Sequence, residues 1–260
     1  MNWEETIDPV IIDNARKVDE IFEKFPYVKD LAQRLRERKM KVIENLEFYV
    51  EQTIKSVEKL GGKAYLAKTK EEANRIIGEI VGSEKKVVIS KSNVAYETGL
   101  REFLQKQKNE VWETDLGEFL VQLQDGWPSH IVAPSIDLKR EEAGKLIHKI
   151  NPKIGKESSV EDMVRAVREF LMDKYIHADF GITGANAVSA DTGSVTLVEN
   201  EGNIRMDTVL PSSHIVITGI DKIVPTLPDA LDEVMVQSAN AGLFPPTYIN
   251  VTSGQAQLQT

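Results

Sequence analysis

Apolar residues recur at helical spacing through the first 60 residues of the chain. One run covers residues 11–25 and a second covers residues 28–60, with Pro26 between them and a Gly-Gly pair after the second. The pattern predicts two helices, which we interpret as an N-terminal helical extension spanning residues 1–60. The basic side chains near residues 34–41 are typical of a solvated helix face, and a docking surface for a partner is the alternative.

After residue 62 the pattern changes to short apolar runs that alternate with helical segments. Strands are predicted at residues 64–67, 86–90, 110–114 and 129–133, helices at 70–81, 93–106, 140–150 and 159–175, and a short strand or turn at 117–122. This alternation indicates an α/β domain with an open parallel or mixed sheet, covered on both faces by helices.

From residue 178 the chain favours consecutive strands joined by Gly and Asn turns. They are predicted at residues 178–183, 194–199, 203–209 and 214–219, followed by a helix at 227–239 and a last strand at 247–252. We interpret this part as a β-rich extension of the same sheet. Residues 61–260 are therefore assigned to one α/β domain.

Composition and charge exclude several functions. The net charge of −9 disfavours binding to nucleic acid or to an anionic membrane surface. The chain has no cysteine and only four histidines, so it cannot ligate an iron–sulfur cluster through cysteine, and no metal site is expected. The N-terminus lacks the features of a signal peptide, and no apolar run is long enough to span a bilayer. We expect a cytoplasmic protein.

The stretch from residue 178 to residue 227 carries the most candidate chemistry, because Gly, Asn, Thr and Ser cluster between its predicted strands. Arg205 is suited to hold a carboxylate bidentately, and Glu201 or His214 is the candidate base. Possible hydrogen-bond donors to a ligand are Gly184 through its backbone, Asn186, Thr192 and Asn203. The alternative interpretation is that these residues only form tight hairpin turns.

Two further segments follow predicted strands. Lys91 and Ser92 come directly after the buried strand at residues 86–90 and precede a predicted helix, a position where open α/β sheets bind ligands. Asp115 and Glu118 follow the next strand and are candidates for proton transfer, although acids at such positions more often cap turns. The chain contains neither a P-loop nor a GxGxxG nucleotide motif.

Several short motifs occur in the order found in the lactate-utilisation (LUD) domain family, which the chain resembles from about residue 40 to its end. These motifs are Ser90-Lys-Ser92, Glu113-Thr-Asp-Leu-Gly-Glu118, Pro128-Ser-His130, Gly184-Ala-Asn186, Thr192-Gly193, Asn200-Glu-Gly-Asn203, His214 and Lys222-Ile-Val-Pro225. The acidic motif and the Pro-Ser-His motif resemble the iron–sulfur subunit of the family more than its smaller partner. Asp137 departs from the pattern, because family members often have histidine there.

The resemblance implies a fold of the CoA-transferase and ribose-5-phosphate isomerase type. It also implies a role in a complex that oxidises L-lactate to pyruvate, with other lactate-utilisation subunits as partners and a small carboxylate as ligand. The [4Fe–4S] clusters of such a complex are expected in a region beyond Thr260 or in a partner, because this chain has no cysteine.

Two alternatives stay open at the level of sequence. One is a transferase or isomerase of the CoA-transferase-like fold that uses Glu199 or Glu201 as nucleophile or base. The other is a non-catalytic assembly module that docks through the helices of residues 11–60.

Overall fold

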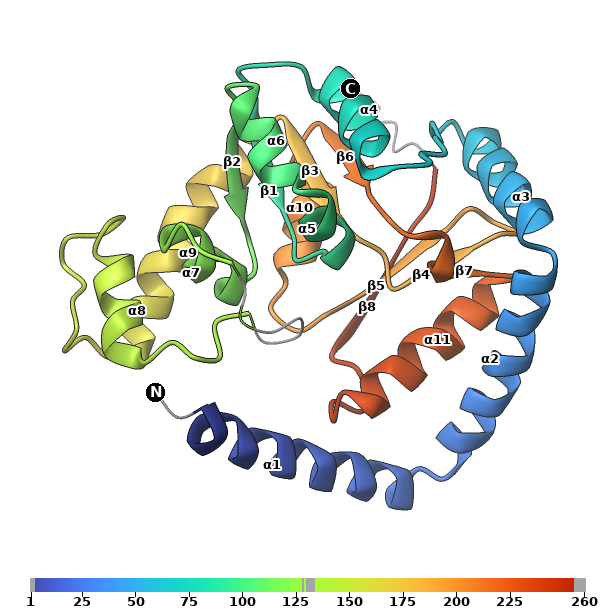
Figure 1. The fold of residues 1–260 in the computed structure, drawn as a ribbon, viewed down its shortest axis with the longest axis horizontal. Helices are drawn as coiled ribbons and strands as arrows, with labels where there is room; N and C mark the ends of the chain where they lie inside the picture. The colour runs from blue at the N-terminus through green and yellow to red at the C-terminus, as the bar shows by residue number, and fades with distance from the viewer. Residues whose placement is uncertain (1–2, 128, 130–133, 255–260) are drawn as a thin grey trace. The chain divides into compact units, whose positions relative to one another are not determined.

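The computed structural model describes residues 3–127, 129 and 134–254, and it shows an α/β protein (Figure 1). The chain forms two compact units. The first, here called the parallel-sheet unit, consists mainly of Thr69–Gly184 and Gly202–Ile217. The second, the mixed-sheet unit, consists mainly of Asp8–Lys68, Ala185–Glu201 and Thr218–Thr260. The boundary expected at residue 60 stays a prediction.

The parallel-sheet unit contains a four-stranded sheet in the order β2-β1-β3-β6, and every neighbouring pair is parallel. The strands are β1 (Lys86–Ile89), β2 (Glu110–Glu113), β3 (Phe180–Thr183) and β6 (Ser213–Val216). The central strand β1 is apolar without alternation because both of its faces are buried.

Helices cover both faces of this sheet. Val87 and Ile89 pack with α4 (Lys70–Val81), α5 (Asn93–Thr98) and α6 (Leu100–Lys106). Val88 points to the opposite face and packs with α7 (Leu116–Leu123), α8 (Arg140–Ile147) and α9 (Val160–Ile176). The alternation of side chains along a strand therefore divides the core of the unit into two layers.

The strand order creates a switch point in the sheet. The chain runs from β1 outward to β2, crosses back to β3 on the other side of β1, and continues to β6. The direction of strand addition thus reverses between β1 and β3. In open α/β sheets, ligands bind outside the carboxyl ends of the strands at such a point.

The mixed-sheet unit contains a second four-stranded sheet, in the order β7-β4-β5-β8. Its strands are β4 (Ala187–Ser189), β5 (Val195–Glu199), β7 (Ile223–Val224) and β8 (Tyr248–Thr252). Strand β4 is parallel to β7 and antiparallel to β5, and β5 is antiparallel to β8. Strands β4, β5, β7 and β8 therefore build their own sheet. The expectation that the later strands extend the first sheet is correct for β6 and wrong for these four.

Helix α2 (Tyr27–Glu44) packs along α11 (Leu227–Asn240) in this unit (Figure 1). Leu35 of α2 contacts Ala187, Val224 and Ala230, which joins the two helices to the sheet. Arg38 pairs with Asp229, and Lys39 lies 2.9 Å from a carboxylate oxygen of Glu233, so part of the basic face predicted to be solvated forms ion pairs instead. Helices α1 (Trp3–Lys24) and α3 (Leu46–Lys59) and the 3-10 turn η1 (Ile220–Lys222) complete the described elements.

Several predicted elements are confirmed, including the helix at residues 70–81 with its Thr69 cap, the strands at 86–90 and 110–114, and the helices at 140–150, 159–175 and 227–239. The predicted helix at 28–60 is divided at Asn45 into α2 and α3, and the one at 93–106 is divided at Gly99, whose φ is 66°. Residues 64–67 form no strand, and residues 130–133 of another predicted strand lie outside the described part.

Two short segments were assigned the wrong structure. Residues 117–122 belong to helix α7, which begins where Asp115 accepts hydrogen bonds from the backbone. Residues 203–209 form helix α10 (Asn203–Val209), which packs against β3. Ile204 and Met206 alternate with polar neighbours as a strand would, and seven residues are too few to separate the two periods.

The α/β class is confirmed, and the CoA-transferase-like subtype stays a prediction. Within the described part of the chain, no helix has both the length and the apolar composition needed to cross a bilayer.

Candidate functional site

The loops that leave β1 and β3 meet at the switch point of the parallel-sheet unit. The Ser90 amide donates to the Ile182 carbonyl oxygen at 2.9 Å, which extends the pairing of the two strands. A Cβ placed on Gly184 would lie 2.9 Å from Ser92 Oγ, so only glycine lets the loops approach this closely. The structure therefore brings together Lys91, Ser92 and Gly184, three of the predicted site residues.

A small pocket opens beside these loops. Its volume is about 10 Å³, which is room for about one water-sized group. Strands β1 and β2 and helices α5, α6 and α7 contribute the side chains that line it, which are Ile89, Ser90, Ser92, Ala95, Tyr96, Arg101, Glu102, Glu113 and Glu118. Most of these groups are polar, although they belong to the interior of an α/β unit.

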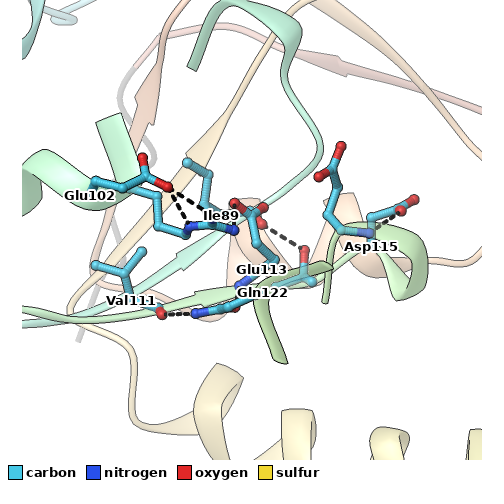
Figure 2. Close-up of polar contacts among 9 residues, drawn as sticks. Ile89, Glu102, Val111, Glu113, Asp115 and Gln122 are labelled. Carbon is cyan, nitrogen blue, oxygen red and sulfur yellow. Dashed lines mark hydrogen bonds and ion pairs between the residues drawn. The ribbon is translucent and has the colours of Figure 1, made fainter. Parts of the chain in front are cut away.

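Glu113 and Arg101 are two of the charged residues that line the pocket. Arg101 lies 2.8 Å from a carboxylate oxygen of Glu102 and 3.5 Å from one of Glu113. The Glu113 amide donates to Gln122 Oε1 at 2.9 Å, and Gln122 Nε2 donates to the Val111 carbonyl oxygen at 2.7 Å (Figure 2). These contacts join helix α7 to the end of β2 and hold Glu113 in place.

Two carboxyl groups of the pocket have raised pKa values. Burial raises the pKa of Glu113 well above its usual value, and the nearby Arg101 opposes this rise. Burial also raises the pKa of Glu118, with Lys91 and Arg101 opposing and Asp115 reinforcing the rise. A protonated carboxyl group is a hydrogen-bond donor as well as an acceptor, so the pocket can offer both functions to a ligand.

Two hydroxyl groups that line the pocket are buried and have no hydrogen-bond partner among the residues that the structure describes. They are Ser90 Oγ and the Tyr96 hydroxyl. Burial raises the pKa of Tyr96 to about 12, so its hydroxyl stays protonated at neutral pH. The exposed ring of Trp127 meets Tyr96 edge to face, with ring centroids 5.0 Å apart. Buried hydroxyls normally have partners, so the lack of one among the described residues marks these two groups as candidates to contact a ligand.

Asp115 has a structural role. Its Oδ1 accepts hydrogen bonds from the Gly117 amide at 3.0 Å and the Glu118 amide at 3.3 Å, as an N-cap does (Figure 2). Thr114 Oγ1 donates to the buried Asp207 at 2.7 Å. These contacts anchor the segment after β2, so Glu118 is the member of the predicted acidic pair that faces the pocket.

His214 lies on β6 in the same unit. Its Nε2 lies 2.8 Å from Thr183 Oγ1 at the end of β3. Burial lowers the pKa of His214 to about 4, so the imidazole is neutral at physiological pH. Because the protonated imidazole has so low a pKa, neutral His214 is a weak base. It suits a hydrogen-bonding role better than proton abstraction.

The other predicted residues are distributed between the two units. Asn203 and the exposed Arg205 belong to α10 of the parallel-sheet unit, which follows Gly202 in the left-handed conformation. Glu201, which is exposed, belongs to the mixed-sheet unit together with Asn186 and Thr192. A role for these residues in binding or catalysis stays a prediction.

Asn186 and Thr192 make hydrogen bonds that stabilise the β4–β5 region. Asn186 donates to Gln237 Oε1 at 2.8 Å and accepts from the Val198 amide at 2.9 Å. Thr192 Oγ1 donates to Ser194 Oγ at 2.8 Å and lies 2.5 Å from Ser189 Oγ. These contacts agree with the alternative that both residues shape a hairpin.

Sequence reasoning missed Tyr96 and Arg101. Tyr96 follows the Ser92 cap by four residues, one helical turn, which places both on the same side of α5. That spacing was a usable signal. Arg101 lies beyond the Gly99 break and reaches Glu113 on another strand, so only the folded chain shows its role.

The site offers no metal centre. Over the described ranges, no group of three His, Cys, Asp or Glu side chains is arranged to hold a metal ion. The chain also has no cysteine for an iron–sulfur cluster, so its residues do not fit such a group.

The fold and the pocket define an α/β protein with a small pocket at the carboxyl ends of β1 and β2 in a parallel sheet. The model of the LUD domain matches residues 50–258, and the chain belongs to the LUD domain family. No solved structure gave a match.

Curated relatives extend this assignment. The chain is 39% identical over 231 residues to lactate utilization protein B of Bacillus subtilis (strain 168), which is 87% of this chain and 47% of that protein. It is 41% identical over 201 residues to lactate utilization protein B of Shouchella clausii (strain KSM-K16), covering 76% of the chain and 42% of the relative. A relative from Escherichia coli (strain K12), named uncharacterized electron transport protein YkgF, is 39% identical over 81% of the chain and 44% of its own length. The chain thus spans about half the length of the curated relatives it matches.

Proposed function

We propose that this chain is the LUD domain of a subunit that takes part in the oxidation of L-lactate to pyruvate, and that it binds a small carboxylate at the carboxyl edge of its parallel sheet. The observation that carries the proposal is the 39% identity to lactate utilization protein B over 87% of the chain. The switch-point loops supply the place, because they converge there and the loop after β1 borders the pocket.

Lys91 is the residue we propose to attract the carboxylate. It lies between Ser90 and Ser92 in the β1 loop, and its charge acts on Glu118 in the pocket wall. A lysine ammonium beside a partly buried site binds an anion more strongly than one in open solvent, because screening is weaker there. Arg205 is a second cation of the same unit for this role.

Electron transfer would belong to other parts of the system. We propose that [4Fe–4S] clusters are held by residues outside this chain or by partner subunits, because this chain has no cysteine to ligate them. The chain would then act in the cytoplasm with other lactate-utilisation subunits. In that arrangement its own residues bind and orient the carboxylate substrate.

Titration of the ¹⁵N-labelled chain with L-lactate and with pyruvate tests the proposal. We expect concentration-dependent shifts of the amides of Lys91, Ser92 and Gly184. Lys91→Ala should weaken binding about fivefold or more, as for a lost charge-assisted contact. Lys145→Ala, at an exposed position of α8, is the matched control and should leave binding unchanged. Unmoved amides at about ten millimolar of either ligand would contradict the proposal.

A further inference from the structure

The unpartnered hydroxyls suggest what the pocket itself recognises. We propose that the pocket formed by Ser90, Tyr96, Glu113 and Glu118 binds the hydroxyl group of a 2-hydroxy acid, while the carboxylate of the same ligand lies at Lys91. The ligand class rests on the proposed function. The hydroxyl-binding pocket rests on its own geometry.

The size of the pocket limits which group of a ligand can enter it. A volume of about 10 Å³ admits about one water-sized group and no ring or chain. A hydroxyl on a small ligand is about this size, and a carboxylate with two oxygens is larger. The pocket therefore selects one functional group of a ligand whose remaining atoms stay outside.

The hydrogen-bonding groups of the pocket also limit which ligand group can bind there. Ser90 is 1% exposed, and its Oγ has no partner among the described residues. Tyr96 is half-buried, and its hydroxyl oxygen is buried and likewise has no partner among those residues. Each hydroxyl lost its contacts with water on burial, and a bound group restores a hydrogen bond to it. A hydroxyl both donates and accepts, so it can serve these two groups and a carboxyl oxygen at once.

The charged side chains around the pocket limit the charge of the group that can bind there. Glu102, Glu113 and Glu118 line the pocket together with Arg101, so an anionic group in the pocket would meet several carboxyl groups. Burial raises the pKa of Glu113 and of Glu118, which reduces this repulsion without removing it. An uncharged hydroxyl inside and a carboxylate outside, near Lys91, is the orientation that these charges favour.

A panel of three small ligands tests this orientation. L-lactate carries both groups, propionate lacks the hydroxyl, and 1,2-propanediol lacks the carboxylate. Binding is followed by the amide shifts of Ser90 and Tyr96 and by the fluorescence of Trp127, which contacts Tyr96. We expect L-lactate to bind at least about tenfold more tightly than propionate, because a site built for a hydroxyl disfavours an analogue without it.

Two variants separate recognition from structure. Ser90→Ala and Tyr96→Phe each remove one unpartnered hydroxyl, so we expect an unchanged or higher melting temperature together with a loss of the preference for lactate over propionate. Thr114→Val is the contrasting control, because the Thr114 hydroxyl already donates to Asp207. That variant should lower the melting temperature.

The outcomes distinguish the pocket from the proposed function. Equal affinity for lactate and propionate would keep a carboxylate site and overturn the hydroxyl pocket. A response of the pocket amides to 1,2-propanediol, with none to either carboxylate, would support the hydroxyl pocket and overturn the proposed function. No response to any of the three ligands would overturn both. A lower melting temperature of Ser90→Ala or Tyr96→Phe, with ligand preference retained, would also count against the pocket.

Discussion

Single buried groups determine the chemistry of this domain. Glu113 is 7% exposed and lies beside Arg101, yet burial outweighs that cation and raises the pKa of the carboxyl group. His214 shows the opposite shift from the same cause, because burial disfavours the charged form of each group. Burial therefore shifts the protonation equilibrium of both side chains toward the neutral form, which can donate or accept hydrogen bonds.

Replacing Glu113 with glutamine should change how stability depends on pH. A raised folded-state pKa means that the contribution of Glu113 is fully present below its unfolded pKa, about 4.5, and is lost as pH rises through the folded value. Urea unfolding at pH 5 and pH 8 should show Glu113→Gln gaining stability relative to the natural chain at the higher pH. Glu141→Gln is the control, since the pKa of exposed Glu141 is lowered by a hydrogen bond to its own backbone, and it should show no such gain. An equal effect of Glu113→Gln at both pH values would contradict the prediction.

His214 should titrate far below an ordinary histidine. Its lowered pKa means that its contribution to stability is fully present above about 6.5 and is lost as pH falls toward about 4. A pH titration of the imidazole nitrogens by NMR measures this directly. A midpoint near 6.5 would show that the ring is hydrated and that its contact with Thr183 does not hold in solution.

At the scale of elements, close backbone approach decides where helix α10 sits. A Cβ on Gly181 would lie 1.7 Å from the carbonyl oxygen of Asp207 and 3.0 Å from Pro211 Cγ. Glycine at this position lets α10 press against β3, which buries Asp207 where it accepts from Thr114. Because Gly181 has no side chain, α10 can contact β3, and its Asp207 reaches Thr114 at the end of β2.

Gly181→Ala should therefore destabilise the chain strongly. Because the obstructing atom belongs to the backbone, we expect a loss of about 3 kcal/mol or more in the free energy of unfolding. Gly155→Ala is the matched control: a Cβ there has no atom within 4 Å, so stability should change by less than about 1 kcal/mol. Similar unfolding midpoints for the two variants would show that α10 can move away from β3.

At the scale of the whole molecule, the N-terminal helices belong to the fold of the mixed-sheet unit. Val42 of α2 packs with Ala190 and Ile223, and Ile21 of α1 packs with Val28 and Ala239. Arg38 and Lys39 pair with Asp229 and Glu233, which are 2% and 7% exposed. These helices cover apolar surface and neutralise buried acids, so they are more than an appended docking element.

Deleting residues 1–44 should unfold the mixed-sheet unit while the parallel-sheet unit stays folded. The deletion exposes the apolar partners of α2 and leaves the acids of α11 without their cations. Hydrogen exchange should show protection lost in β4, β5 and α11 and kept in β1 and β3. Full protection of β4 and β5 in the deleted chain would show instead that the helices are dispensable, as an assembly module would require.

The sequence alone determined the elements with strong local signals. The Thr69 cap, the uninterrupted apolar run of β1 and the ordered motifs identified helix α4, the buried strand and the family. These features depend on neighbours within a few residues, so they can be read along the chain. Lys91 and Ser92 were predicted for a similar reason, because strand ends with polar residues mark the carboxyl edge of a sheet. Gly184 was predicted from the local cluster of Gly, Asn, Thr and Ser between strands.

Only the tertiary structure decided how distant segments combine. The division into two sheets depends on which strands pair, and the alternation of apolar residues is the same for either pairing. Helix α10 packs against β3 because Gly181, on that strand, has no side chain to obstruct the helix backbone. The pocket likewise needs Arg101 from α6 against Glu113 from β2, and burial, which no local pattern records, raises the pKa of Glu113.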